Sequence, residues 1–244
     1  MKENFIFDLY GTLVSIHTDE KKRSFWTKMA EIYSGFGANY SATELKKAYL
    51  RLCAKEEKKL QKKYGAYAEI ELRKVFVALF REKGVAPKKD LVEYIGVTFR
   101  VLSRSHIYVY DGVFDLFEEI KRQDKKIYLL SNAQNVFTVP ELKVTGLYDW
   151  FDGIYISSDK HLKKPDGRFL EQLLKEYGLD KEASVMIGND RTSDIAVANA
   201  CGVDSLYIHS ENSYPDRIRP KSEKEKATYE VLDGDVGKVK KLLL

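Results

Sequence analysis

Residues 5–13 have the sequence FIFDLYGTL, in which an apolar, β-prone run ends at a single carboxylate, Asp8. A turn containing Gly11 and Thr12 follows directly. Ligands of open α/β sheets bind at the carboxyl ends of the strands. An aspartate presented there can act as a nucleophile. The stretch therefore predicts a buried strand that carries a catalytic aspartate at its tip.

The composition limits the class of protein. The chain has 244 residues, of which 44% are hydrophobic and 32% charged, as is typical of a soluble globular protein. The net charge of +4 does not argue for nucleic acid, but it suits a small anionic substrate. Cys53 and Cys201 lack metal-ligand spacing and predict reduced thiols. With a strand starting within four residues and no apolar run near the roughly 20 residues of a membrane span, we expect a soluble cytoplasmic protein without a membrane partner.

Further apolar runs alternate with helical patterns along the rest of the chain. The runs cover residues 126–130, 153–156, 183–187 and 204–208, and a late edge strand is expected within 227–232. The helical patterns cover residues 113–123, 140–145, 167–177 and 193–200. Near-continuous apolar strands separated by helices are typical of a parallel sheet covered on both faces. The predicted fold class is α/β, with a doubly wound, Rossmann-like core.

The segment between the first two core strands is different, because it is helical almost throughout. Helices are expected over residues 21–33, 41–63, 68–83 and 88–103. Four helices inserted at this point predict a small cap over the carboxyl ends of the strands. We therefore expect a core made of residues 1–16 and 105–244 and a cap domain made of residues 17–104.

Four short motifs lie at the expected strand ends, in a fixed order. They are DLYGTL at 8–13, LSN at 130–132, KPD at 164–166 and IGNDRTSDI at 187–195. Their order and spacing resemble those of the haloacid dehalogenase (HAD) superfamily of hydrolases, and the helical insertion resembles the four-helix cap of that family. The resemblance covers essentially the whole chain and implies a hydrolase.

The motifs predict a role for each of five side chains. Asp8 is expected to be the nucleophile, forming a covalent intermediate that water then hydrolyses. Thr12 and Ser131 can donate hydrogen bonds to a substrate oxygen, or can simply stabilise turns. Lys164 would neutralise Asp8 and a bound anion, keeping the nucleophile ionised. Asn132 can bind the substrate or cap a turn.

The fourth motif predicts a metal site. Asp190 and Asp194 lie four residues apart across a strand-to-helix turn. Mg²⁺ prefers oxygen ligands and keeps several waters, so one or two carboxylates and a backbone carbonyl are enough to bind it. Asp8, the carbonyl of Tyr10 and Asp190 are the expected ligands, with Asp194 at or just beyond the ion. Asp194 can also be an ordinary carboxylate in the first turn of a helix. Asn189 can assist the same site.

Tyr10 departs from the phosphatase pattern of the family that the chain resembles. Those phosphatases have a second aspartate there as general acid and base, a role typically worth roughly 10²–10⁴-fold in rate. A phenol with a pKa near 10 is a poor replacement at neutral pH. Tyrosine is typical of the dehalogenase branch, in which a halide leaves unprotonated and no metal is used. However, that branch has another tyrosine six residues after the lysine, where this chain has Leu170.

The preferred hypothesis is Mg²⁺-dependent hydrolysis of a small phosphorylated metabolite through an aspartyl intermediate on Asp8. Acyl or aryl phosphates, which have good leaving groups, would suffer least from Tyr10. One alternative is a metal-free, haloacid dehalogenase-like hydrolase. The other is a non-catalytic homologue that binds phosphate or a metal. The chain has neither a GxGxxG nor a GxxxxGK motif, so dinucleotide and nucleoside-triphosphate binding lack support.

Overall fold

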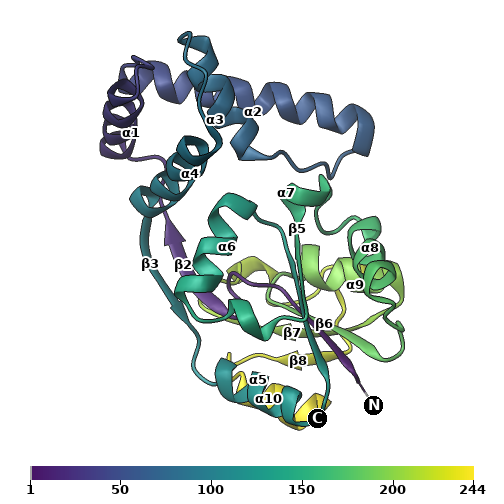
Figure 1. The fold of residues 1–244 in the computed structure, drawn as a ribbon. Helices are drawn as coiled ribbons and strands as arrows, with labels where there is room; N and C mark the ends of the chain where they lie inside the picture. The colour runs from purple at the N-terminus through teal and green to yellow at the C-terminus, as the bar shows by residue number, and fades with distance from the viewer. Residues whose placement is uncertain (1) are drawn as a thin grey trace.

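A computed structural model describes residues 2–244, and its centre is a six-stranded parallel sheet (Figure 1). In spatial order the strands are β5 (Gly153–Ile156), β4 (Lys126–Ser131), β1 (Asn4–Phe7), β6 (Ser184–Gly188), β7 (Asp204–Ile208) and β8 (Tyr229–Val231). The predicted α/β class, the parallel sheet and the late edge strand are confirmed. Because β1 pairs with both β4 and β6, the three strands that carry most of the motifs lie next to one another.

Helices cover both faces of this sheet. The core helices are α5 (Val113–Arg122), α6 (Asn135–Val144), α7 (Ser157–Lys160), α8 (Gly167–Tyr177), α9 (Ala196–Cys201) and α10 (Gly237–Leu243). Side chains of β1 alternate between two apolar clusters: Phe5 and Phe7 pack with Phe117 of α5, while Ile6 packs with Phe169 of α8. This alternation follows from the two-residue period of a strand and buries β1 on both faces.

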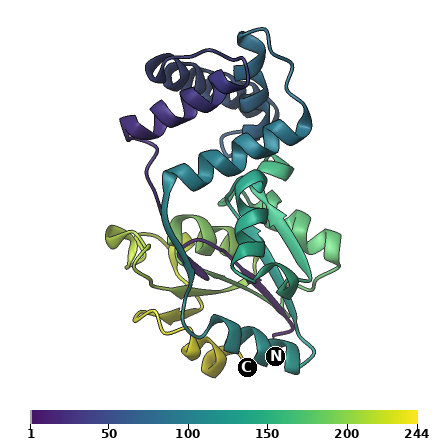
Figure 2. The same cartoon turned by 60° about the vertical axis from the view of Figure 1, so that its left-hand side comes forward.

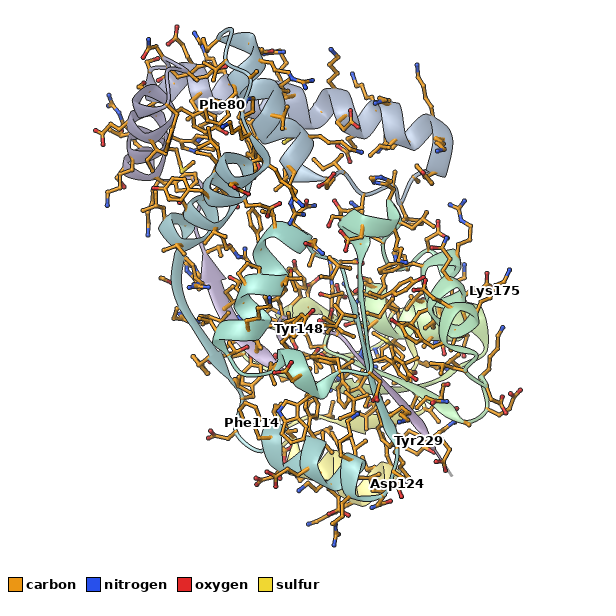
Figure 3. All side chains as sticks on the ribbon, viewed as in Figure 1. Phe80, Phe114, Asp124, Tyr148, Lys175 and Tyr229 are labelled. Atoms are coloured by element: carbon orange, nitrogen blue, oxygen red, sulfur yellow. The ribbon has the colours of Figure 1, made fainter. Side chains whose placement is uncertain are left out.

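The inserted helices pack around an apolar cluster of their own. They are α1 (Arg23–Gly35), α2 (Ala42–Tyr64), α3 (Leu72–Glu82) and α4 (Lys89–Ser103). They gather at one end of the molecule, opposite both chain termini (Figures 1 and 2). Trp26, Phe76 and Phe99 are buried there, together with Phe80, which is labelled in Figure 3. The four helices predicted between the first two core strands are therefore confirmed as elements.

A two-stranded antiparallel ribbon connects these helices to the sheet. Its strands are β2 (Val14–Thr18) and β3 (Arg104–Val109). The predicted domain boundaries, 16/17 and 104/105, both fall within this ribbon, and the division into two domains stays a prediction. Of the helices within residues 2–244, none combines the length and the apolar character that crossing a bilayer requires.

In the inserted group, α3 begins at Leu72, four residues after its predicted start, and α1 is shifted by two residues. Two core helices also differ from their predicted bounds by more than one residue. The short helix expected from Pro140 onward is the second half of α6, which begins at Asn135. A proline inside a helix loses one hydrogen bond, so the pattern suggested a helix start at that residue. The helix nevertheless begins earlier, because Ser158 accepts a hydrogen bond from the Asn135 amide and because Val136 and Phe137 pack against the cap helices. The helix expected at 193–200 begins with a wider π-type turn over Arg191–Ile195 before α9.

Candidate active site

The predicted motifs meet at the carboxyl ends of the sheet strands. Asp8 directly follows β1, Ser131 ends β4, and Asp190 lies just beyond β6. A cavity of about 360 Å³ opens at this point. Its lining includes Asp8, Tyr10, Gly11, Ile16, Asn132, Lys164, Asn189, Asp190, Ser193, Asp194, Asn212 and Tyr214. Carboxylates that are far apart in the sequence therefore share one cavity, as the order of the strands requires.

Lys164 is the buried cation of the site. Its Nζ atom lies 2.7 Å from Asp8 Oδ1 and 2.7 Å from Asp194 Oδ1, and it donates to the carbonyl of Leu130 at 2.7 Å. Its side chain is only 1% exposed. Burial alone would lower the pKa of Lys164, but the charges of Asp194 and Asp8 outweigh burial and raise it. The ammonium group therefore stays charged and holds the carboxylates of Asp8 and Asp194 together.

Asp194 lines the cavity but is almost completely buried. Burial raises the pKa of Asp194 to about 7; Lys164 opposes this rise and the charge of Asp8 adds to it. Its Oδ2 accepts a hydrogen bond from the backbone amide of Asp190 at 2.9 Å. A Cβ atom on Gly188 would lie 2.3 Å from the Asp194 carboxylate, so only glycine fits at the end of β6. The predicted proximity of Asp194 to Asp8 is observed, with Lys164 between them.

Asp190 differs from its predicted arrangement. Its Oδ1 accepts from the amide and the hydroxyl of Thr192 at 2.9 and 2.8 Å, and its Oδ2 accepts from Arg217 Nη1 at 2.9 Å. Both oxygens are therefore engaged in capping the following turn and in an ion pair. Asp190 lines the same cavity as Asp8 and Tyr10, and its metal role stays a prediction. Arg217 lies 27 residues further along the chain, and no sequence signal pointed to it.

Asn189, the residue before Asp190, faces the nucleophile turn instead. Its Oδ1 accepts from the Thr12 hydroxyl at 3.3 Å, and its Nδ2 donates to Ser213 at 3.3 Å. A Cβ on Gly11 would lie 2.2 Å from this amide, and Gly11 has a φ of +84°. Gly11 therefore allows both the turn and the close approach of Asn189 to the loop that carries Asp8.

The oxygen donors around the cavity decide whether Mg²⁺ fits. Within residues 2–244, no three His, Cys, Asp or Glu side chains form a cluster arranged to bind a metal. Asp8, the Tyr10 residue and Asn189 nevertheless line one cavity and offer a carboxylate, a backbone carbonyl and an amide oxygen. Mg²⁺ keeps several waters and needs only one or two carboxylates. The donor set therefore fits a Mg²⁺ ion held by one or two carboxylates and by water.

The hydroxyl and amide groups of the second motif have different surroundings. The buried Ser131 hydroxyl has no hydrogen-bond partner within the described part of the chain. Buried polar groups are normally bonded, so this hydroxyl has a hydrogen bond still to make. Ser131 is not among the residues that line the cavity, and its bond to a substrate oxygen stays a prediction. Asn132 lines the cavity, but its Oδ1 accepts from the Lys164 amide at 2.8 Å and its Nδ2 donates to the Lys164 carbonyl at 3.0 Å. Asn132 thus positions Lys164, and its contact with substrate stays a prediction.

Thr12 is turned toward its own loop. Its hydroxyl lies 3.4 Å from Asp8 Oδ2 as well as contacting Asn189. This places Thr12 behind the nucleophile, where it orients the Asp8 carboxylate. A direct bond from Thr12 to the substrate stays a prediction.

Tyr10 lines the cavity, but its hydroxyl is bound elsewhere. The phenol donates to Glu141 Oε2 at 2.5 Å and lies 3.1 Å from the Thr138 hydroxyl, both on α6. Burial, reinforced by the negative charge of Glu141, raises the pKa of Tyr10 far above its usual range. The phenol therefore keeps its proton at neutral pH, which makes Tyr10 an even poorer proton acceptor than the sequence predicts. The residue six positions after Lys164, Leu170, is fully buried in the core and offers no polar group to the site.

Comparison with known proteins gives the class of this chain. A family model described as haloacid dehalogenase-like hydrolase matches residues 3–202. The chain therefore belongs to the haloacid dehalogenase-like hydrolases, and the resemblance inferred from its motifs is confirmed.

Its sequence relatives include phosphatases. The chain is 30% identical to the pyrimidine 5′-nucleotidase PynA of Streptococcus pneumoniae over 105 residues, 41% of this chain and 44% of that protein. It is 27% identical to the glyceraldehyde 3-phosphate phosphatase of Methanothermobacter thermautotrophicus over 51% of this chain and 54% of that protein. The chain thus matches about half the length of these curated relatives.

Solved structures share the complete fold. The magnesium-bound HAD-hydrolase YfnB of Bacillus subtilis has a TM-score of 0.55 at 17% identity, covering 99% of this chain and 98% of that one. A 2-haloacid dehalogenase from Pseudomonas syringae has a TM-score of 0.60 at 18% identity, covering 95% and 94%. At this level of identity the two structures establish the fold but do not distinguish a phosphatase from a dehalogenase.

Proposed function

We propose that this chain is a Mg²⁺-dependent phosphohydrolase that acts on a small phosphorylated metabolite through an aspartyl phosphate on Asp8. The observation that carries the proposal is the buried Lys164 bridge between Asp8 and Asp194, together with the Ser131 hydroxyl at the end of β4, which has no partner within residues 2–244. This arrangement combines an ionised nucleophile with a fixed positive charge and a free hydrogen-bond donor. Relatives named as a nucleotidase and as a phosphatase support the same class of substrate.

The chain's own residues suit two consecutive displacements at phosphorus. In the first, an Asp8 oxygen bonds to phosphorus while the bond to the leaving oxygen breaks, and that oxygen takes the electron pair. Lys164 keeps Asp8 ionised and Ser131 donates to a phosphoryl oxygen. In the second, water attacks phosphorus, which releases inorganic phosphate and restores the Asp8 carboxylate. When bound, Mg²⁺ supplies positive charge that neutralises the phosphoryl oxygens.

The leaving group receives no proton from residue 10, because the Tyr10 phenol is bonded to Glu141. A phosphate ester with a basic alkoxide leaving group depends strongly on such a proton. We therefore propose acyl or aryl phosphates as the preferred substrate class, since their leaving groups are stable anions.

One observation favours a second candidate, a metal-free dehalogenase-like hydrolase. Tyrosine at position 10 matches the first motif of that branch, and a halide needs no proton to leave. Leu170, buried where that branch has a tyrosine, argues against it.

The test is a substrate panel assayed with Mg²⁺ and, separately, with EDTA. It contains acetyl phosphate, aryl phosphates, alkyl phosphates and 2-haloacids. We expect Mg²⁺-dependent phosphate release that is fastest for the acyl and aryl compounds and is abolished in Asp8→Asn. Halide release in EDTA would instead identify a dehalogenase. No turnover, with ligands still raising Tm, would indicate a binding protein.

A further inference from the structure

The most heavily bonded carboxylate outside the catalytic cavity belongs to Glu141 of α6. Its side chain is 4% exposed. Oε2 accepts the Tyr10 hydroxyl at 2.5 Å and Arg100 Nη2 at 3.3 Å. Oε1 accepts Arg100 Nε at 2.9 Å and Arg104 Nη1 at 2.8 Å. One buried acid therefore binds two guanidinium groups and a phenol.

These partners come from three different parts of the fold. Tyr10 lies two residues after the nucleophile, Arg100 is in the last turn of α4, and Arg104 is the first residue of β3. Helices α4 and α6 are in contact, and α4 leads directly into β3 (Figure 1). Glu141 thus connects the nucleophile loop, the last helix of the inserted group and the ribbon that returns to the sheet.

The geometry keeps the phenol as a hydrogen-bond donor. The Tyr10 hydroxyl donates to Glu141 Oε2 at 2.5 Å and lies 3.1 Å from the Thr138 hydroxyl, so both polar neighbours of the phenol belong to α6. The Arg100 guanidinium lies 5.3 Å from the centre of the Tyr10 ring and the same distance from that of Phe137. Glu141 Oε1 accepts from both arginines while Oε2 accepts from Tyr10, so both carboxylate oxygens are held in place. The bond is therefore a fixed link between Tyr10 and Glu141.

We propose that Tyr10 is a positioning residue that ties the nucleophile loop to α4 and β3 through Glu141, and that it transfers no proton to or from the leaving group. Placement of Asp8 is then coupled to the orientation of the inserted helices. The catalytic part of this proposal rests on the proposed phosphohydrolase function. The link itself is independent of it, because it can be measured without turnover.

The catalytic arm compares wild type with Tyr10→Phe on aryl phosphates whose phenol leaving groups differ in pKa. Phenylalanine keeps the ring under Arg100 and removes only the hydroxyl. A positioning role predicts that kcat/KM falls by a similar factor, about three- to tenfold, for every substrate. The slope of log kcat/KM against leaving-group pKa then stays unchanged. A loss that grows steadily with leaving-group pKa would overturn the proposal, because it would show proton donation.

The structural arm measures backbone hydrogen exchange over residues 100–109 by mass spectrometry. We expect severalfold faster exchange there in Tyr10→Phe. Glu141→Gln keeps the shape and one amide oxygen as acceptor, so it should retain part of the protection, while Glu141→Ala should lose it. Tyr155→Phe is the matched control: Tyr155 also donates to a carboxylate, that of Glu176, but on β5 and away from Glu141.

Unchanged exchange over residues 100–109 in Tyr10→Phe would overturn the link, and so would the same increase in Tyr155→Phe. If no substrate in the panel is hydrolysed, the proposed function fails while the exchange measurements still decide whether the link exists.

Discussion

Replacing Lys164 with methionine removes the positive charge that pairs with both Asp8 and Asp194. At 2.7 Å and an effective dielectric constant of about 20, each ion pair contributes on the order of 6 kcal/mol of Coulomb attraction. Desolvation of the buried ions offsets several kcal/mol per ion. Removing one partner of such a buried group leaves its carboxylates uncompensated, which typically costs about 3–5 kcal/mol. We expect Lys164→Met to lower the free energy of unfolding by that amount at pH 8.

The assay is urea unfolding in EDTA at pH 8 and pH 5.5. The loss should be smaller at pH 5.5, because burial raises the pKa of Asp194 to about 7 and a protonated Asp194 needs no cation. Phosphohydrolase activity should fall at least about 10²–10³-fold, as when a preorganised charge-stabilising group is removed. Lys163→Met, a change in the half-buried neighbouring lysine, is the matched control. It removes a charge near Glu69 but no ion pair with Asp8 or Asp194, so it should cost about 1 kcal/mol or less. Equal losses for the two variants, or a larger loss at pH 5.5, would refute the reasoning.

Three further predictions concern the metal, the pH dependence and the leaving group. Asn189→Asp adds a carboxylate beside the loop that carries Asp8, so the Kd for Mg²⁺, measured by titration calorimetry, should fall about tenfold. An unchanged Kd would place the ion elsewhere. Burial raises the pKa of Asp194 to about 7, so the native state holds a proton that the unfolded state releases near pH 4. The unfolding free energy of wild type relative to Asp194→Asn should therefore fall between pH 4 and 7, by up to about 1 kcal/mol per pH unit in urea titrations; a rise would contradict this. Tyr10→Asp restores a possible general acid at position 10, and Glu141→Gln removes the negative charge that would repel the new carboxylate. The double variant should hydrolyse alkyl phosphates faster than Glu141→Gln alone. No gain would count against the idea that this site lacks a general acid.

The sheet and its motifs could be predicted because they depend on local patterns. Apolar runs that end in small or acidic residues identify strands that are buried on both faces. Once Asp8, Ser131 and Asp190 were placed at strand ends, the topology of a parallel sheet brought them to one edge. Lys164 was expected near Asp8 for the same reason, and the ion pair at 2.7 Å confirms it.

The direction of individual side chains could not be predicted in the same way. Asn189 and Asp190 are consecutive, and Asp190 has extended backbone angles of −120° and 112°. Neighbouring side chains on extended backbone point to opposite sides, so only one of the two can face the nucleophile turn. The preference of Mg²⁺ for carboxylates favoured Asp190, whereas the structure turns Asn189 toward Thr12 and Asp190 toward Arg217.

The partners of Tyr10 also lie outside what local patterns contain. Glu141 is 131 residues away in sequence, and Arg100 belongs to a different helix. A charged residue on a helix usually predicts a solvent-exposed side chain. Glu141 is buried only because two arginines and a phenol converge on it, and that convergence depends on how α4 and α6 pack.

The most direct test of the central claim is the mass of the peptide containing Asp8 after acid quenching during turnover of an aryl phosphate with Mg²⁺. The account predicts a peptide that carries one phosphoryl group at Asp8 in wild type and no such peptide in Asp8→Asn, which should also be inactive. Steady turnover with no phosphoryl group on Asp8, together with wild-type rates in Asp8→Asn, would contradict it.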